Sequence, residues 1–353
     1  MNTLDSKYQE LLQDIIDNGV VKTDRTGTGT ISVFGRQIKH KMSQGFPLLT
    51  TKKMAWKTMV TELLWFLKGD TNIKYLVDNG CHIWDGDAYK NYQKRMTEWF
   101  GNESQLTKEL FIEKIKTDDE FAKKWGELGP IYGRMWRKFD EDSYGGIDQI
   151  QNLINDLKTN PDSRRLMVTA WHPGYNQHSV LPPCHYGFQV YTRELSIEER
   201  LDLASKTYKV FDPFDFHVGD HKEIDELYPV PKRAISLMFN MRSNDVPLGL
   251  PFNLASYGLL LEILAKEVNM VPEDLIGNLG DCHIYLNQID GVKEQLIREP
   301  YKKLPTLKFS PIVSAHFEHH LDTFDEFIKN LQPHQFIIDG YESHPPIKIP
   351  LSN

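Results

Sequence analysis

The sequence is poor in cysteine and in long apolar runs. Three of its 353 residues are cysteines, Cys81, Cys184 and Cys282, and they form neither an even disulfide framework nor a Cys-x-x-Cys pair. This pattern suits free thiols in a reducing compartment. No apolar run approaches the roughly 18 residues needed to cross a bilayer, and the first residues, MNTLD, include an acid and no hydrophobic signal core. We expect a cytoplasmic protein without a membrane span.

The sequence also lacks an excess of basic side chains. Lysine and arginine number 41 against 49 aspartates and glutamates, which gives a formal net charge of −8. Nucleic-acid binding depends on a basic field that releases counterions from phosphates. We therefore expect no nucleic-acid partner, although a small anion can bind where arginines converge.

Residues 181–191, LPPCHYGFQVY, are the most informative segment that is present. Cys184 follows two prolines, precedes His185 and opens a strand-like run. A thiolate adds well to electron-poor carbon, and a partly exposed cysteine beside a cation can ionise near neutral pH. A lone cysteine is more often a small buried core residue, so other segments must decide.

Six further segments have a fixed order along the chain, and together with Cys184 they resemble the thymidylate synthase family from about residue 5 to the C-terminus. They are DRTGTGT (24–30), ELLWFLKGD (62–70), GPIYG (129–133), DSRR (162–165), FNMRSNDVPLGLPFNLASY (239–257) and GDCHIY (280–285). The resemblance implies an α/β (α+β) fold with a mixed, kinked β-sheet flanked by helices. It also implies a homodimer in which the sheets of two subunits pack face to face.

The apolar periodicity predicts the main elements of this fold. Helices are expected at residues 5–18, 55–67, 147–159, 253–268 and 285–298, and strands at 27–38, 166–171, 184–191 and 234–242. Chain length allows one α/β domain with excursions, so we expect a single domain, 1–353. Residues 89–124, polar and helical in period, are interpreted as one insertion, and residues 193–232, charged and without clear periodicity, as a second.

The resemblance implies reductive methylation of dUMP to dTMP with 5,10-methylenetetrahydrofolate as co-substrate. In this chemistry Cys184 adds to carbon 6 of uracil, so that carbon 5 can attack the methylene group. By resemblance Arg242 lies beside Cys184, where its charge favours the thiolate. Glu62, Tyr132 and His185 match the polar set that organises water and moves protons, and a glutamate in so apolar a helix is costly unless paired or protonated.

A dianionic phosphate is best bound by several arginines, which offer planar, bidentate donors. The residues that match the family's phosphate site are Arg25, Arg164, Arg165, Arg242 and Ser243. In that family the equivalents of Arg164 and Arg165 reach across from the partner subunit, so the resemblance implies an obligate homodimer. Each arginine alone would otherwise be interpreted as a solvated surface charge.

The other site residues are assigned by the same resemblance. Asn253 can pair with O4 and N3-H of uracil through its amide, or it can be an ordinary helix cap. His283 and Tyr285 match residues that bind the deoxyribose 3′-hydroxyl. The folate site comprises Asp245 at the pterin, Ile83 and Trp84 packing against it, and Lys52 near its tail. Lys52 has a competing interpretation as a surface lysine.

Two histidine pairs have helical spacing, His217 with His221 and His316 with His320. Such pairs can bind zinc, but neither has a convincing third ligand in the sequence and the inferred reaction needs no metal. We therefore predict no metal cofactor.

Three positions depart from the commonest family pattern: Met241, Asp87 and the terminal Asn353. The family's C-terminal tail closes over the folate and excludes water, and a looser tail favours capture of the intermediate by water. A dUMP hydroxymethylase that yields 5-hydroxymethyl-dUMP and tetrahydrofolate is therefore an alternative. A non-catalytic nucleotide- or RNA-binding relative is a second one.

Overall fold

The computed structural model describes the whole chain except residues 1, 25, 101–104, 142–144, 209–220 and 353. Its centre is a mixed six-stranded sheet with the order β1-β2-β6-β5-β4-β3. The strands are β1 (Val20–Lys22), β2 (Thr30–Lys41), β3 (Met167–Thr169), β4 (His185–Glu194), β5 (Arg233–Asp245) and β6 (Val271–Tyr285). Only β5 and β6 are parallel among these pairs, and register shifts at the start of β4 and near the start of β5 bend the sheet. The predicted mixed, kinked sheet is confirmed.

The parallel pair is joined by helix α12 (Gly249–Glu267), which crosses one face of the sheet. This helix begins four residues before the predicted start, because Pro251 in its first turn is compatible with helical geometry. Strand β6 was not predicted. Its sequence contains Gly277, Gly280 and several acids that disfavour strands, but pairing with β2 on one side and β5 on the other overrides that local preference.

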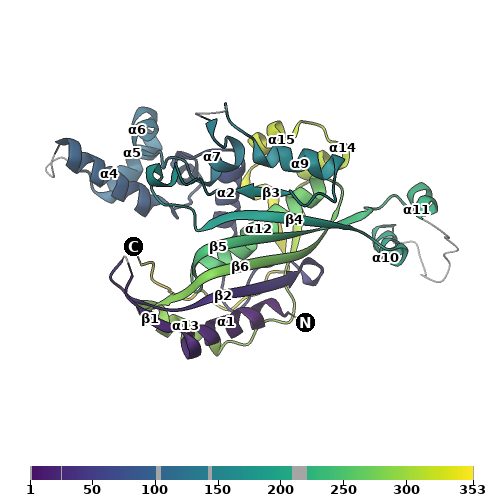
Figure 1. Ribbon diagram of the computed structural model, residues 1–353, viewed down its shortest axis with the longest axis horizontal. Coiled ribbons are helices and arrows are strands. Elements are labelled where there is room, and N and C mark those ends of the chain that lie inside the picture. Colours follow the sequence, from purple (N-terminus) through teal and green to yellow (C-terminus); the bar gives the residue numbers. More distant parts are fainter. Residues whose placement is uncertain (1, 25, 101–104, 142–144, 209–220, 353) are drawn as a thin grey trace.

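Further helices cover the same face as α12, whereas the face toward the viewer in Figure 1 carries no helix over β4, β5, β6 and β2. The elements that form this helical layer and the sheet edge are α1 (Leu4–Asn18), α2 (Trp56–Leu67), α7 (Tyr132–Arg137), α9 (Gln149–Thr159) and α13 (Ile289–Leu296). The apolar positions of α1, α2 and α9 are buried as their periodicity predicts.

The predicted helix 285–298 is too long at both ends. Tyr285 is the last residue of β6, where it pairs with Thr30, and the short 3₁₀ turn η5 (Leu286–Gln288) precedes α13. Strand pairing therefore includes Tyr285, which the helical periodicity had assigned to a helix. The other 3₁₀ turns are η1 (Met42–Gln44), η3 (Asn176–His178) and η6 (Pro333–Gln335).

The C-terminal part forms a small two-stranded sheet and two helices, followed by an extended tail. These elements are β7 (Thr306–Phe309), α14 (Pro311–His319), α15 (Phe324–Asn330) and β8 (Phe336–Asp339). The tail then returns over α13, where Ile347 and Ile349 lie against Gly291. This course takes the described end of the chain to the β1 end of the sheet (Figure 1).

The first predicted insertion is helical, as expected. Its elements are α4 (Asp85–Phe100), α5 (Lys108–Thr117) and α6 (Asp119–Trp125), and α3 (Lys74–Asp78) precedes them. Phe111, Ile115 and Trp125 are buried and belong to the main hydrophobic core. This segment is therefore packed as a continuation of the core.

The second predicted insertion differs in packing. It contains α10 (Ile197–Tyr208) and α11 (His221–Leu227), so the expectation of no regular periodicity is wrong for these stretches. Ala204, Ile224 and Val230 form a small cluster of their own, apart from the main core. Figure 1 shows both helices beyond the end of β4 and β5.

Candidate active site

The candidate nucleophile lies where β4 begins and β5 approaches its end. Cys184 immediately precedes β4, and its carbonyl accepts a hydrogen bond from the Arg242 backbone N–H (2.9 Å). The register that pairs His185 with Met241 thus brings Cys184 and Arg242 together from positions 58 residues apart. The predicted proximity of these two side chains is confirmed.

The Arg242 guanidinium is held in place by the strand that carries the cysteine. Its Nε donates to the Pro183 carbonyl (2.8 Å), and its Nη2 donates to the Pro182 carbonyl (2.8 Å). Nη2 also lies 3.9 Å from Cys184 Sγ. Burial raises the pKa of the Cys184 thiol, the Arg242 charge opposes this by lowering it, and the Asp87 carboxylate raises it further. The Arg242 charge thus acts in the predicted direction, although burial outweighs it and the net pKa is raised.

Tyr132 and His185 form the wall beside the thiol. The Tyr132 hydroxyl accepts a hydrogen bond from the Cys184 N–H (2.8 Å), and the Tyr132 and His185 rings stack with centroids 3.9 Å apart. His185 Nδ1 shares a hydrogen bond with the Tyr257 hydroxyl (2.8 Å). Burial lowers the pKa of His185 to about 3, so this ring is neutral at physiological pH.

Glu62 on α2 lies on the same side and is mostly buried. The Trp84 indole N–H donates to Glu62 Oε1 (2.8 Å), and the Trp84 ring meets Tyr132 edge to face at 6.3 Å. Burial raises the pKa of Glu62 to about 7, although the Trp84 hydrogen bond opposes it. Glu62 can therefore hold or release a proton near neutrality, as a general acid or base requires.

Asp245 and Lys52 form a second buried polar group. Asp245 accepts hydrogen bonds from the Leu248 N–H (3.1 Å) and from Gln288 Nε2 (3.0 Å). Burial raises the pKa of Asp245, and burial lowers the pKa of Lys52 to about 8 against the attraction of Asp245. Lys52 donates to the Pro247 carbonyl and is only 5% exposed, so its interpretation as a surface lysine is wrong.

Gln288 joins this group to the C-terminal tail. Its side-chain amide donates both to Asp245 and to the Pro350 carbonyl (3.1 Å). The sequence interpretation missed Gln288, because a glutamine within the predicted helix 285–298 gives no signal of its tertiary partners. The tail therefore lies next to the residue predicted to bind the pterin.

The residues predicted to bind the nucleoside lie on neighbouring elements at the same end of the sheet. Asp245 pairs with His283, and Ser243 pairs with Asp281, across β5 and β6. Asn253 is the fifth residue of α12, so it is not the helix cap that the sequence allowed. Its half-buried amide has no hydrogen-bond partner among the described residues, which leaves its donor and acceptor available to a ligand.

His283 and Tyr285 follow on β6. His283 Nδ1 lies 3.0 Å from Asp281 Oδ1, and the His283 and Tyr285 rings meet edge to face at 5.1 Å. Trp84 is 6% exposed and Ile83 is 39% exposed beside it. An accessible apolar side chain next to a buried indole can support a flat ligand.

The predicted arginine cluster is only partly assembled within one chain. Arg164 and Arg165 are exposed in the turn before β3, and in the described ranges neither side chain makes a hydrogen bond or ion pair with Cys184 or Arg242. Arg25 lies outside the described residues, as does Asn353. Within a single subunit, Arg242 is thus the described arginine that contacts the nucleophile.

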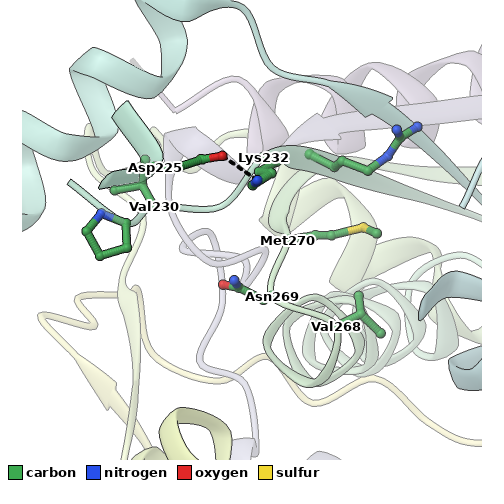
Figure 2. Close-up of a pocket in the computed structure, with 8 residues that line it drawn as sticks. Asp225, Val230, Lys232, Val268, Asn269 and Met270 are labelled. Atoms are coloured by element: carbon green, nitrogen blue, oxygen red, sulfur yellow. Dashed lines mark hydrogen bonds and ion pairs between the residues drawn. The ribbon is translucent and has the colours of Figure 1, made fainter. Parts of the chain in front are cut away.

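The cavity drawn in Figure 2 is remote from this site. It has a volume of about 460 Å³ and is lined by Asp225, Pro229, Val230, Lys232, Arg233, Val268, Asn269 and Met270. Arg233 opens β5 and Arg242 stands nine residues later on the same strand, a span of about 30 Å. The dashed contact in Figure 2 joins Asp225 to Lys232, so the charges there already pair with each other.

Together, the bent mixed sheet, the thiol beside a fixed guanidinium and a carboxyl with a pKa of about 7 are features expected of an enzyme with a cysteine nucleophile. The thymidylate synthase family profile matches residues 6–353. The chain is 41% identical to the thymidylate synthase of Mesoplasma florum over 338 residues, which cover 96% of both chains. It is 42% identical to that of Malacoplasma penetrans, over 97% of this chain and 98% of the relative.

The chain belongs to the thymidylate synthase family and is an enzyme of the methyltransferase class. The predicted family is confirmed. This membership supports reductive methylation over the hydroxymethylase and non-catalytic alternatives. A search of the described helices finds none with the length and apolarity that crossing a bilayer requires.

Proposed function

We propose that the protein methylates dUMP to dTMP with 5,10-methylenetetrahydrofolate, and that Cys184 is its nucleophile. The observation that carries the proposal is the position of Cys184 Sγ, 3.9 Å from a guanidinium whose other donors are fixed on the cysteine's own strand. A cation so held stabilises negative charge on sulfur without reorganising. The Asn253 amide, unpaired within the described chain, supports uracil as the base.

The first chemical step is addition of Cys184 Sγ to carbon 6 of the uracil ring. The thiol proton leaves, an Sγ–C6 bond forms, and the electron pair of the C5–C6 double bond moves toward O4 to give an enolate. Carbon 5 then attacks the one-carbon unit of the folate. Because burial raises the pKa of Cys184, deprotonation is favoured only when the bound nucleotide adds its own interactions to that of Arg242.

The later steps need protons to leave carbon 5 and to reach the folate amine. Glu62, with a pKa of about 7, suits this exchange because both of its forms are populated near neutrality. Tyr132 and the neutral His185 hold the Cys184 backbone and the wall of the site. Asp245 and Lys52 would orient the pterin and the folate tail, and the tail of the protein closes over them through Gln288.

The homodimer is part of this proposal. Arg164 and Arg165 are exposed, and among the described residues neither forms a hydrogen bond or ion pair with Arg242 of the same chain. This suits phosphate binding across an interface. Two apolar side chains on the uncovered face of the sheet are exposed, Tyr191 (67%) and Met167 (59%). They lie on the same face as a polar row in which Asn278 hydrogen-bonds with Gln37 and Asn240. Exposed apolar surface of this kind marks an interaction site, and face-to-face packing of two sheets would bury it.

The remaining assignments follow from packing and thiol chemistry. We treat residues 1–353 as a single domain in which 89–124 extends the core and 193–232 is an excursion. Three free cysteines suit a reducing compartment, which supports a cytoplasmic location. No step of the proposed reaction calls for a metal ion.

The test is direct. The protein is incubated with dUMP and methylenetetrahydrofolate while dihydrofolate is followed by absorbance and the nucleotide is identified by mass. Stoichiometric dTMP and dihydrofolate are expected. Hydroxymethyl-dUMP without dihydrofolate, or no product at all, would refute the proposal.

A further inference from the structure

Three side chains that can bind metals meet at the end of α12 that is opposite the candidate active site. Glu267 is the last residue of α12, His316 is in α14, and His320 directly follows α14 (Figure 1). Their ligand atoms all lie within 4.8 Å of one another. The sequence had offered His316 and His320 without a third ligand, and the fold supplies Glu267. The other pair cannot be assessed, because His217 lies outside the described residues.

Two of these residues carry buried polar atoms that need a partner. Glu267 is 4% exposed and His316 is 3% exposed. Within the described chain, Glu267 Oε2 and both ring nitrogens of His316 are buried without a hydrogen bond. Buried polar groups in native proteins almost always have partners, so such a group suggests an ion or water that the chain itself does not supply.

The geometry around these atoms fits a metal ion. His316 Nε2 lies 3.4 Å from Glu267 Oε2, and His320 Nδ1 lies 3.9 Å from Glu267 Oε1. Tetrahedral zinc with bonds of about 2.1 Å separates its ligand atoms by about 3.4 Å. The first pair already has this spacing. The His320 side chain is 47% exposed, so it can rotate to complete the set.

The orientation of His316 is fixed by its surroundings. Its ring stacks on Phe327 of α15 with centroids 3.6 Å apart and an angle of 3° between planes. Stacking on a buried ring restricts the rotation of the His316 side chain. His316 therefore presents Nε2 toward Glu267 before any ion binds.

A simpler interpretation is an ion-pair group. Lys158 Nζ donates to Glu267 Oε1 (2.7 Å), so this oxygen already has a cationic partner. However, Lys158 leaves Oε2 and both His316 nitrogens without hydrogen bonds in the described part of the molecule. An ion bound by Glu267 Oε2, His316 Nε2 and His320 would satisfy Oε2 and Nε2, two of the three atoms that Lys158 does not reach.

We propose that Glu267, His316 and His320 bind a divalent transition-metal ion such as zinc, with water as the fourth ligand. Two imidazoles and one carboxylate are a ligand set that zinc accepts. Asn253 and Glu267 stand 14 residues apart on α12, about 21 Å along the helix axis. The ion would therefore act as a structural brace between α12 and α14, and it would take no part in the proposed reaction.

The test uses the untagged full-length protein after treatment with EDTA and dialysis. Zinc is titrated calorimetrically, and cobalt(II) is used as a probe whose visible absorption distinguishes tetrahedral from octahedral coordination. We expect one ion per chain, a tetrahedral cobalt spectrum without a thiolate band, and a Tm that rises by at least about 2 °C with zinc. A thiolate band would instead place the ion at a cysteine and overturn the proposal.

Variants separate the metal site from general histidine binding. His320→Ala, at an exposed position, is expected to weaken zinc binding by at least about 10-fold, whereas His319→Ala at the end of the same helix should not change it. Lys158→Met should tighten zinc binding, because it frees Glu267 Oε1. Equal affinities for the two histidine variants, or no saturable binding by the unmodified chain, would exclude the site.

Discussion

At the scale of single residues, the Cys184 thiol is subject to two opposed effects. Burial raises its pKa, and the fixed charge of Arg242 lowers it. If Cys184 is the nucleophile, as proposed, the thiol form is the one favoured before substrate binds, and a protonated thiol is less prone to side reactions than a thiolate. Asp87, noted first as a departure from the family pattern, adds a negative charge that also raises this pKa.

Cys184→Ser tests the nucleophile. A hydroxyl is a far weaker nucleophile than a thiol near neutral pH, so kcat is expected to fall by at least about 1,000-fold, or about 4 kcal/mol of transition-state stabilisation. Binding of dUMP, followed by calorimetry, should be retained, because the phosphate and base contacts stay in place. Cys282→Ser, at a buried cysteine with no contact to Cys184 among the described residues, is the matched control and should leave kcat nearly unchanged. Turnover by Cys184→Ser at the normal rate would exclude this cysteine.

Glu62→Gln tests the raised pKa of Glu62 through the pH dependence of the free energy of unfolding. In the folded protein the pKa of Glu62 is about 7, against an ordinary value of 4.5. Between these pH values the folded state holds a proton that the unfolded state has lost, so this group makes stability fall as pH rises. The glutamine variant cannot ionise. Its free energy of unfolding relative to the unmodified protein should therefore increase by about 3 kcal/mol from pH 4.5 to 7.5.

Urea denaturation at several pH values measures this difference, and the amide oxygen can still accept the Trp84 hydrogen bond. The pH-dependent part of the difference in free energy of unfolding reports the ionisation of Glu62, because a change in packing would be independent of pH. Activity should fall by about 100-fold or more, as expected for loss of a general acid or base. A stability difference that stays constant with pH would show that Glu62 titrates normally.

At the scale of elements, the parallel pair β5 and β6 with α12 between them arranges both ends of the molecule. The active-site end gathers Arg242, Asp245, Asn253 and His283. The opposite end gathers Glu267 with α14. One strand–helix–strand unit therefore holds the candidate active site and the proposed metal site at a fixed separation. The separation is fixed because neither the helix nor the strands can stretch.

The excursion 193–232 is expected to be dispensable for the fold. Glu194 and Arg233 are paired in register at the ends of β4 and β5, so residues 195–232 can be replaced by Asn-Gly in a two-residue turn. The small cluster of Ala204, Ile224 and Val230 is separate from the main core. We expect kcat/KM to stay within about threefold, less than about 1 kcal/mol. Loss of the folded state on this replacement would show that the excursion is part of the core.

The contrasting deletion, of residues 89–124, provides the comparison. It removes Phe111 and Ile115, which are 0% exposed within the main core. Each loss of such a side chain costs about 2–5 kcal/mol, so this variant should not fold. Circular dichroism and thermal melts of the two deletions distinguish an excursion from an extension of the core.

At the scale of the whole molecule, the proposed dimer decides whether a site is complete. Arg164 and Arg165 are exposed, and the face of the sheet toward the viewer in Figure 1 has no covering helix over its central strands. If the arginines act across the interface, each site draws residues from two chains. A C2 dimer then contains two identical shared sites.

Mixed dimers test this arrangement. Cys184→Ser and the double variant Arg164→Ala/Arg165→Ala should each be nearly inactive alone. After dissociation and reassociation in equal amounts, half of the dimers are mixed, and each mixed dimer has one intact site. Activity is therefore expected to recover to about one quarter of the normal value. A mixture that stays inactive, while sedimentation shows dimers, would mean that the arginines act within their own subunit.

The sequence by itself determined the family, the amphipathic helices and the candidate reactive side chains. Helix periodicity placed α1 and α9 within one or two residues, because burial of one face is a local pattern. Cys184, Glu62 and Arg242 were identifiable because their residue types recur in ordered motifs. The sequence did not indicate the role of Gln288, whose side chain hydrogen-bonds to Asp245 and to the Pro350 carbonyl.

Tertiary structure alone decided the rest. β6 is a strand because two neighbours pair with it, although its own residues favour turns. The pKa values of Glu62, Lys52 and His185 are set chiefly by burial, which no local pattern reports. Glu267 reaches His316 only because the fold brings the last residue of α12 to α14, and contacts between distant segments depend on the whole fold.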